Sequence, residues 1–310
     1  MTNLRKILDL YRDPEYLAEL RKIGIPIVIQ QFTFSALNML GVIFVGQKGD
    51  ASVAAVGLAG QIAFILNLVH FGIISGAAMF TAQFWGRQDI PNLRRVLGLC
   101  LMLAIAASLV FFSISQFIPT QLLGIYSRDA AVIEIGADYL RIFSWTFLFF
   151  AVTLSYSLVM RSTGDAKTPT IISVGALSIS TVLSYALIFG RFGLPELGVQ
   201  GAAVAAVIAR GLECVALLLV AYAQRSPVAA SLRELTGFNR KFVGKVIKPM
   251  LPVILNELLW SLGITTYNVI YARIGTTSFA AMNIFSTVEQ MAFVLFFGIS
   301  NATSVMVGNN

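Results

Sequence analysis

Residues 26–46, PIVIQQFTFSALNMLGVIFVG, align without a gap with residues 252–272, PVILNELLWSLGITTYNVIYA, although few residues are identical. The register continues without a gap to residues 83 and 309, and it keeps two apolar runs, the glycine-centred turn between them and their polar flanks. Duplicated membrane units are a common way to build two lobes around one transport pathway. The sequence therefore predicts one hydrophobic unit followed by the start of its own copy.

The composition predicts an all-α integral membrane protein. Hydrophobic residues make up 57% of the chain and charged residues only 12%, whereas about a quarter of the residues in soluble domains are charged. Eight apolar runs are long enough to cross a hydrocarbon core of about 30 Å as helices. The runs cover Ile23–Val45, Val53–Phe80, Val96–Ile118, Val132–Val159, Thr170–Phe189, Val199–Tyr222, Val246–Tyr271 and Phe279–Val307.

The distribution of basic residues predicts the orientation in the membrane. Sixteen of the 22 Lys and Arg residues lie before the first run or in alternate connections, against four in the opposite connections. Because cytoplasmic connections carry the excess of Lys and Arg, the N-terminus is predicted to be cytoplasmic. The net charge of +7 is thus explained by topology, and no nucleic-acid partner is expected. We expect a multi-pass protein of the plasma membrane, with membrane lipids as neighbours.

Four segments follow from this pattern. Residues 1–22 form an amphipathic cytoplasmic segment, and residues 23–223 form an N-terminal lobe of six helices. Residues 224–248 connect the lobes, and residues 249–310 hold the first two helices of a second lobe. Since six is even, helices one and seven run the same way, which predicts lobes related by an axis along the membrane normal. A repeat that stops after two helices suggests a fragment lacking about four.

Glu257 is the main candidate for chemistry, because an ionisable residue at membrane depth is costly and usually functional. It is predicted near the midplane, where a carboxylate can alternate between protonated, sodium-bound and substrate-bound states. The alternative is a neutral glutamate that hydrogen-bonds to a neighbouring helix. Its counterpart in the first lobe is Gln31, and Gln30 falls opposite Asn256, so both lobes carry a polar band.

Other polar residues inside the runs have simpler explanations. Glu289 lies halfway along its run and is a candidate for the cavity, although its polar neighbours could satisfy it. Glu213 follows Arg210 by one turn, which predicts an intrahelical ion pair. His70, without a companion, is predicted to be a hydrogen-bonded packing residue or, alternatively, a proton relay.

The remaining candidates are predicted to be structural. Glu134, Asp138 and Arg141 share a face at the start of the fourth run, where a solvated helix end is favoured over an entrance. Cys100 and Cys214 lie inside apolar runs and are predicted to pack. The sequence contains no metal-ligand cluster, catalytic triad or phosphate-loop motif, so it does not favour an enzyme, and we expect no cofactor.

Several short motifs resemble the multidrug and toxic compound extrusion (MATE) family. They are Asn38–Gly46, Ala54–Ala59, Thr81–Gly86, Arg161–Pro169 and Gly198–Ala203, of which Arg161–Pro169 is the most specific. The resemblance implies a two-lobed antiporter of twelve helices. Such a protein expels small organic compounds, often cationic and aromatic, in exchange for sodium or protons. Asn38 then joins Gln30, Gln31, Asn256 and Glu289 as a candidate cavity residue.

The resemblance also bears on the coupling ion. Family members often carry an acidic residue in the seventh helix, and Glu257 matches that position, which implies a proton or sodium site there. Many relatives have an aspartate where this chain has Gly41 and an asparagine where it has Ser180. These two departures argue against proton coupling in the first lobe.

Two alternatives stay open. A lipid-linked precursor flippase of the same superfamily would share the helices, but it would line its cavity with several basic residues for a pyrophosphate. Within the apolar runs, only Arg210 and Arg141 could bind such a pyrophosphate. A non-transporting fragment or assembly partner is the other alternative.

Overall fold

The structure is a computed structural model that describes residues 32–274 and, beyond them, Glu289, Phe293 and Phe296. Within these residues the secondary structure is helical, as predicted. The elements are a helix over Phe32–Gly46, α3 (Asp50–Gly86), α4 (Ile90–Phe117), α5 (Pro119–Gly124), α6 (Ala130–Phe143), α7 (Trp145–Ser162), α8 (Lys167–Phe189), α9 (Val199–Ala223), α10 (Leu232–Thr236) and α11 (Arg240–Ile274). Residues 37–263 form one compact unit, and the contacts below belong to it.

The predicted membrane spans two to six are confirmed. In the described part of the chain, α3, α4, α8 and α9 are each long and apolar enough to cross a membrane, and α6 with α7 forms a fifth, bent span. The predicted seventh span, Val246–Tyr271, lies within α11. The helix begins at Arg240, because the side-chain oxygen of Asn239 caps it by accepting the N–H of Phe242 at 2.8 Å. The predicted eighth span lies outside the described residues, apart from Glu289, Phe293 and Phe296.

The fourth span breaks at Ser144, where α6 and α7 meet at 43°. A break inside a membrane leaves backbone polar groups that other groups must satisfy. Gln116 of α4 supplies a hydrogen-bond donor at the break. Its amide nitrogen donates to the Arg141 carbonyl at 2.7 Å and lies 2.9 Å from Ser144 Oγ. Ser144 Oγ itself donates to the Arg141 carbonyl at 3.0 Å. The sequence predicted an unbroken helix over Val132–Val159, because the apolar run continues through Ser144. The partner Gln116 lies 28 residues away, so the local sequence does not reveal the break.

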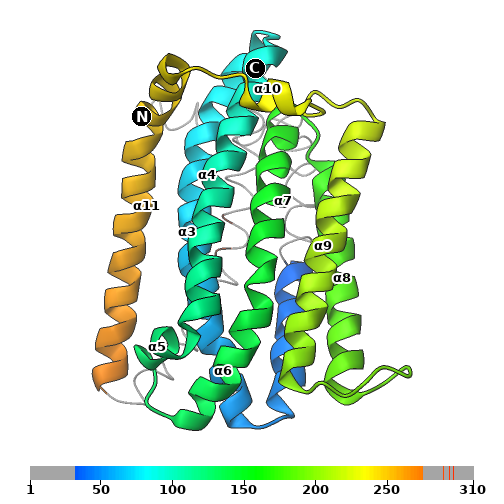
Figure 1. The fold of residues 1–310 in the computed structure, drawn as a ribbon, viewed down its shortest axis with the longest axis vertical. Coiled ribbons are helices and arrows are strands. Elements are labelled where there is room, and N and C mark those ends of the chain that lie inside the picture. Colours follow the sequence, from blue (N-terminus) through cyan, green and yellow to red (C-terminus); the bar gives the residue numbers. More distant parts are fainter. Residues whose placement is uncertain (1–31, 275–288, 290–292, 294–295, 297–310) are drawn as a thin grey trace, which may run out of the picture. The chain divides into compact units, whose positions relative to one another are not determined.

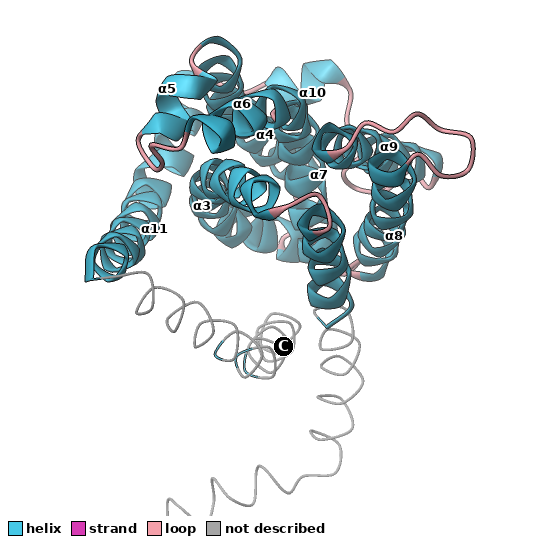
Figure 2. Ribbon diagram, turned by 90° about the horizontal axis from the view of Figure 1, so that it is seen from below, coloured by secondary structure: helices cyan, strands magenta, loops and turns pink. Residues whose placement is uncertain are grey.

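Helices α4 and α7 are neighbours in the bundle (Figure 1). α3 packs against α4, α6 and α7, while α9 packs against α6, α7 and α8 (Figure 2). One close seam joins α8 to α9 at Gly201, where an added Cβ would lie 2.7 Å from the Leu187 carbonyl carbon. Small residues let membrane helices approach in this way.

A second glycine seam joins α3 to α11. A Cβ on Gly72 would lie 3.1 Å from Ile254 Cα, and one on Gly76 would lie 2.7 Å from Met250 Cγ. The two glycines are one turn apart, so they open a continuous groove on α3 into which both α11 side chains fit. Met250 is only 1% exposed and packs in the same apolar cluster as Ile73.

The connection between α9 and α11 is fastened to the bundle rather than loose. Tyr222 of α9 donates its hydroxyl to the Ala230 carbonyl at 2.6 Å, and Arg94 of α4 donates Nε–H to the Pro227 carbonyl at 3.0 Å. Arg94 also forms an ion pair with Glu234 of α10. We call this fastening, made by Arg94, Tyr222 and α10, the connection clasp.

At the opposite end of the bundle, an ion pair ties the turn after the first helix to the α8–α9 loop. Lys48 Nζ lies 2.6 Å from Glu196 Oε1 and 5.3 Å from the centre of the Phe189 ring. The hydrogen bond from Lys48 lowers the pKa of the Glu196 carboxyl. Phe44 packs beside this pair, with its ring centre 6.2 Å from that of Phe189.

We predict that Gly98→Ala loosens the clasp. A Cβ on Gly98 would lie 1.8 Å from the Leu235 carbonyl oxygen of α10, so α10 must move away from α4. Overpacking of this kind costs about 1–3 kcal/mol. Thermal unfolding in detergent measures the loss. The control is Gly175→Ala in α8, where an added Cβ meets nothing within 4 Å and helix propensity predicts a gain of up to about 1 kcal/mol. Equal stability of the two variants would contradict the close approach.

Candidate functional site

The residues of the predicted polar band are placed as follows. Asn38 is exposed in the helix over Phe32–Gly46, and Asn256 is exposed in α11. Glu257 lies at the middle of α11, while its side chain is outside the described part of the structure, as are Gln30 and Gln31. Among the described side chains, no hydrogen bond joins Asn38 to Asn256. In the other compact unit, Glu289 is helical and exposed.

Two prolines interrupt the hydrogen bonding of α11 before Glu257. Pro249 and Pro252 lie inside the helix, and proline has no N–H to donate. The carbonyls of Lys245 and Lys248 therefore lack their usual helical donor. Inside a membrane, such freed backbone groups have to be satisfied by neighbouring helices, hydroxyl side chains or ordered water.

The six-helix part of the bundle holds an interior ion pair between neighbouring turns of α9. Glu213 is 2% exposed, and its Oε2 accepts a hydrogen bond from Arg210 Nη1 at 2.6 Å, as predicted. Ser173 of α8 donates its hydroxyl to the other carboxylate oxygen. The Arg210 guanidinium also lies over the Phe150 ring of α7, 4.9 Å from its centre. Two helices thus satisfy one buried carboxylate, and a third places an aromatic ring against its cation.

His70 is fully buried in α3 and hydrogen-bonded, which confirms the prediction of a packing residue. Its Nε2 lies 3.2 Å from the Ala104 carbonyl oxygen and 3.0 Å from Ser108 Oγ. The Ser108 hydroxyl donates to the Phe147 carbonyl, so both neighbours of Nε2 act as acceptors and the ring proton belongs on Nε2. Among the described groups, Nδ1 has no hydrogen-bond partner.

Phe150 connects the histidine and the arginine. Its ring centre lies 5.8 Å from that of His70, and its face receives Arg210. Sequence reasoning missed Phe150, Ser108 and Ser173, because nothing in the local pattern links them to residues on other helices. The cluster neutralises its own charge, so its arrangement fits a polar core that fixes helix positions rather than a free ion-binding site.

The other sequence candidates lie at helix ends or in the core. Asp138 and Arg141 form an ion pair of 3.4 Å with both side chains 49% exposed, in agreement with a solvated helix end. Cys100 and Cys214 are buried free thiols, as predicted. Both arginines on which the flippase alternative depended, Arg141 and Arg210, engage carboxylates, which argues against a pyrophosphate site built on them.

The motif over residues 161–169 is a tight turn between α7 and α8. Gly164 has φ of +92°, a left-handed conformation that favours glycine. Asp165 Oδ1 accepts the N–H of Thr168 at 3.0 Å in the first turn of α8. Before the turn, Ser162 Oγ lies 2.9 Å from Thr81 Oγ1 of α3. The motif therefore fixes how α8 leaves α7.

The family model described as MatE matches residues 26–186, which is more than half of the chain. This chain belongs to the MATE family. It is similar over 95% of its length to the probable multidrug resistance protein NorM of Thermotoga maritima, with 26% identity, and over 92% to that of Agrobacterium fabrum, with 28% identity. It spans 63% and 62% of the length of these two relatives.

Solved structures of transporters share the fold. An outward-facing MATE family transporter of the MOP superfamily superposes with a TM-score of 0.80 at 19% identity, covering 93% of this chain and 63% of that one. A MOP superfamily transporter from Pyrococcus furiosus gives the same TM-score, identity and coverage. Family membership and the apolar spans together make this MATE chain a membrane protein.

We predict an asymmetry between the two halves of the interior ion pair. Arg210→Met leaves the buried Glu213 carboxylate without its cation, which costs about 3–5 kcal/mol. Glu213→Gln removes the buried carboxylate and keeps the contact of Arg210 with the Phe150 ring, so we expect less than half of that loss. Thermal unfolding of both variants in detergent measures the difference. The double variant Arg210→Met/Glu213→Gln should be more stable than Arg210→Met alone, whereas equal losses for the two single variants would contradict the burial of Glu213.

Proposed function

We propose that this MATE chain supplies the first lobe and part of the second lobe of an antiporter that exports small organic compounds in exchange for sodium or protons. The observation that carries the proposal is the position of Glu257 at the middle of α11, after two prolines, in a chain of this family. Relatives are named multidrug resistance proteins, which supports organic compounds as the exported class.

In this mechanism the coupling ion and the exported compound compete for Glu257. One carboxylate cannot neutralise two cations at once, so binding of either favours release of the other. A carboxylate surrounded by apolar helices has a strong preference for a bound proton or cation, because its bare charge is poorly solvated. The same site can therefore exchange a proton or sodium for an organic cation.

The glycine seam between α3 and α11 supports alternating access. The seam joins a helix of the predicted first lobe to a helix of the predicted second lobe, and it occupies the halves of α3 and α11 nearer to α10. The contact is made by two glycines against apolar groups of Ile254 and Met250, so it can open without breaking hydrogen bonds. We propose that this seam closes one side of the pathway and separates when the other side closes.

The orientation follows from charge. Successive spans cross the membrane in opposite directions, so every second connection lies on the same side. The α3–α4, α7–α8 and α9–α11 connections belong to one side, and they carry eleven basic residues. They are Arg87, Arg94, Arg95, Arg161, Lys167, Arg225, Arg233, Arg240, Lys241, Lys245 and Lys248. We propose that the end of the bundle with α10 faces the cytoplasm, together with the N-terminus, and that the protein resides in the plasma membrane.

The decisive variant is Glu257→Gln in the complete open reading frame that encodes this chain, reconstituted in vesicles with an imposed sodium or proton gradient. Loss of the carboxylate should reduce gradient-driven export of an organic cation to the passive rate. The matched control is Glu134→Gln, which removes an equally charged but exposed carboxylate of α6 and should leave export unchanged. Export by Glu257→Gln at the parent rate would show that coupling lies elsewhere, and the gradient that drives the parent identifies the ion.

A further inference from the structure

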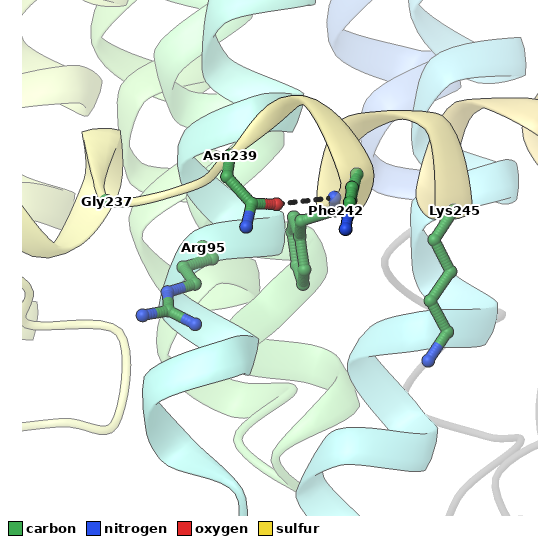
Figure 3. A pocket seen from close by; sticks show the side chains of 6 residues that line it. Arg95, Gly237, Asn239, Phe242 and Lys245 are labelled. Carbon is green, nitrogen blue, oxygen red and sulfur yellow. Dashed lines mark hydrogen bonds between the residues drawn. The ribbon is translucent and has the colours of Figure 1, made fainter.

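A small pocket opens between the first turns of α4 and the start of α11. Its lining consists of Arg95, Gly237, Asn239, Lys241, Phe242 and Lys245, and its volume is about 310 Å³. Figure 3 shows the Arg95 side chain coming from α4 and the Lys245 side chain from α11, with the Phe242 ring between them in this view. The volume is at the lower end of the range for ligand pockets, about 300–1,000 Å³.

The pocket carries positive charge that its own lining does not balance. Three of the six lining residues are cations, and none is a carboxylate. Among the ion pairs of the described residues, none involves Arg95, Lys241 or Lys245. Arg95 donates instead to the neutral side-chain oxygen of Asn92 at 3.0 Å. Like charges held close together favour the binding of an anion.

The acid of the connection clasp, Glu234, already has hydrogen-bond and ion-pair partners. Glu234 accepts hydrogen bonds from the backbone N–H and hydroxyl of Ser231, and it pairs with Arg94. The Ser231 backbone bond, together with the Arg94 and Ser231 side chains, lowers the pKa of the Glu234 carboxyl. Its charge therefore serves the clasp and the cap of α10, not the three cations of the pocket.

The start of α11 adds further attraction for an anion. The first N–H groups of a helix lack intrahelical acceptors, and the helix dipole makes this end positive. Asn239 Oδ1 accepts the N–H of Phe242, so the Asn239 side chain has only its NH₂ group left to offer a ligand, as a donor. Cations, an amide donor and a helix start thus act on the same small volume.

The walls of the pocket are held in place. The Phe242 ring stacks on Phe84 of α3, with ring centres 6.5 Å apart and planes inclined by 21°. The approach of Gly98 to Leu235 and the bond from Arg94 to Pro227 fix the chain just before Gly237. A ligand would therefore meet an aromatic wall and a backbone that are already in place, which lowers the entropic cost of binding.

The position of the pocket along α4 and α11, at the edge of their apolar segments, indicates a lipid as the source of the anion. In α4 no charged residue follows Arg95, and in α11 Lys245 is followed by one more lysine, Lys248, before the uncharged stretch that ends at Glu257. In both helices the basic residues thus stand where the charged segment gives way to the apolar one. Basic pockets at this boundary bind the head groups of anionic lipids.

We propose that this pocket is a binding site for the phosphate of an anionic lipid head group, held by Arg95, Lys241 and Lys245. The site is separate from Glu257, so it stands or falls independently of the proposed ion exchange. A bound lipid would bridge α4 of the first lobe and the first turns of α11, on the same side of the bundle as the glycine seam.

Native mass spectrometry of the chain in a neutral detergent, titrated with phosphatidylglycerol or phosphatidylcholine, tests the site. We expect the parent to prefer phosphatidylglycerol and Lys241→Gln/Lys245→Gln to bind it about tenfold or more weakly. The matched control is Arg233→Gln/Arg240→Gln, which removes two exposed cations of the same region that do not line the pocket. The control should change affinity by less than about twofold, because separated exposed charges are screened.

Three further results complete the test. Lys241→Arg/Lys245→Arg keeps the charges and should retain binding, which separates loss of charge from damage to the fold. Equal weakening by the pocket and control variants, or no weakening by either, would overturn the proposal. Inorganic phosphate is then added at about ten times the lipid concentration. Lipid that stays bound supports the head group as ligand, whereas complete displacement assigns the pocket to soluble phosphate and overturns the lipid source.

Discussion

Close contact at glycines is the constraint on which the rest of this bundle depends. In lipid, the hydrophobic effect does little to hold one apolar helix against another, so association relies on dense packing and interhelical hydrogen bonds. Gly201 brings α9 onto α8, Gly98 brings α10 onto α4, and Gly72 with Gly76 brings α11 onto α3. Each seam needs the missing side chain, because a single Cβ would overlap the neighbouring helix.

The polar interior follows from the same environment. A buried carboxylate in α9 is satisfied by an arginine from its own helix and a hydroxyl from α8, and a break in the fourth span is satisfied by a glutamine from α4. In the absence of water, these partners have to come from the protein. The ordered polar core therefore fixes α3, α4 and α6 to α9 relative to one another, while the contact of α3 with α11 relies on van der Waals packing.

This division suits a transporter with moving lobes. In the proposed mechanism, a lobe can rotate as one body when its charges are neutralised internally, as those of Arg210 and Glu213 are. In the proposed mechanism, α11 would bring the carboxylate of Glu257 to the pathway. The connection clasp keeps the chain between the lobes ordered, and the basic pocket beside it offers a place where the surrounding lipid can act on both.

The sequence by itself determined spans two to six and the pair of Arg210 with Glu213, since apolar length and one-turn spacing are local properties of a helix, and its short motifs determined the family. Only the tertiary structure decided that Ser173 binds Glu213, that Gln116 satisfies the break at Ser144, and that Arg95 shares a pocket with Lys241. These groups come from different helices, and which faces meet depends on how closely glycines let the backbones approach. Such a distance is a property of two packed surfaces, so no single stretch of sequence contains it.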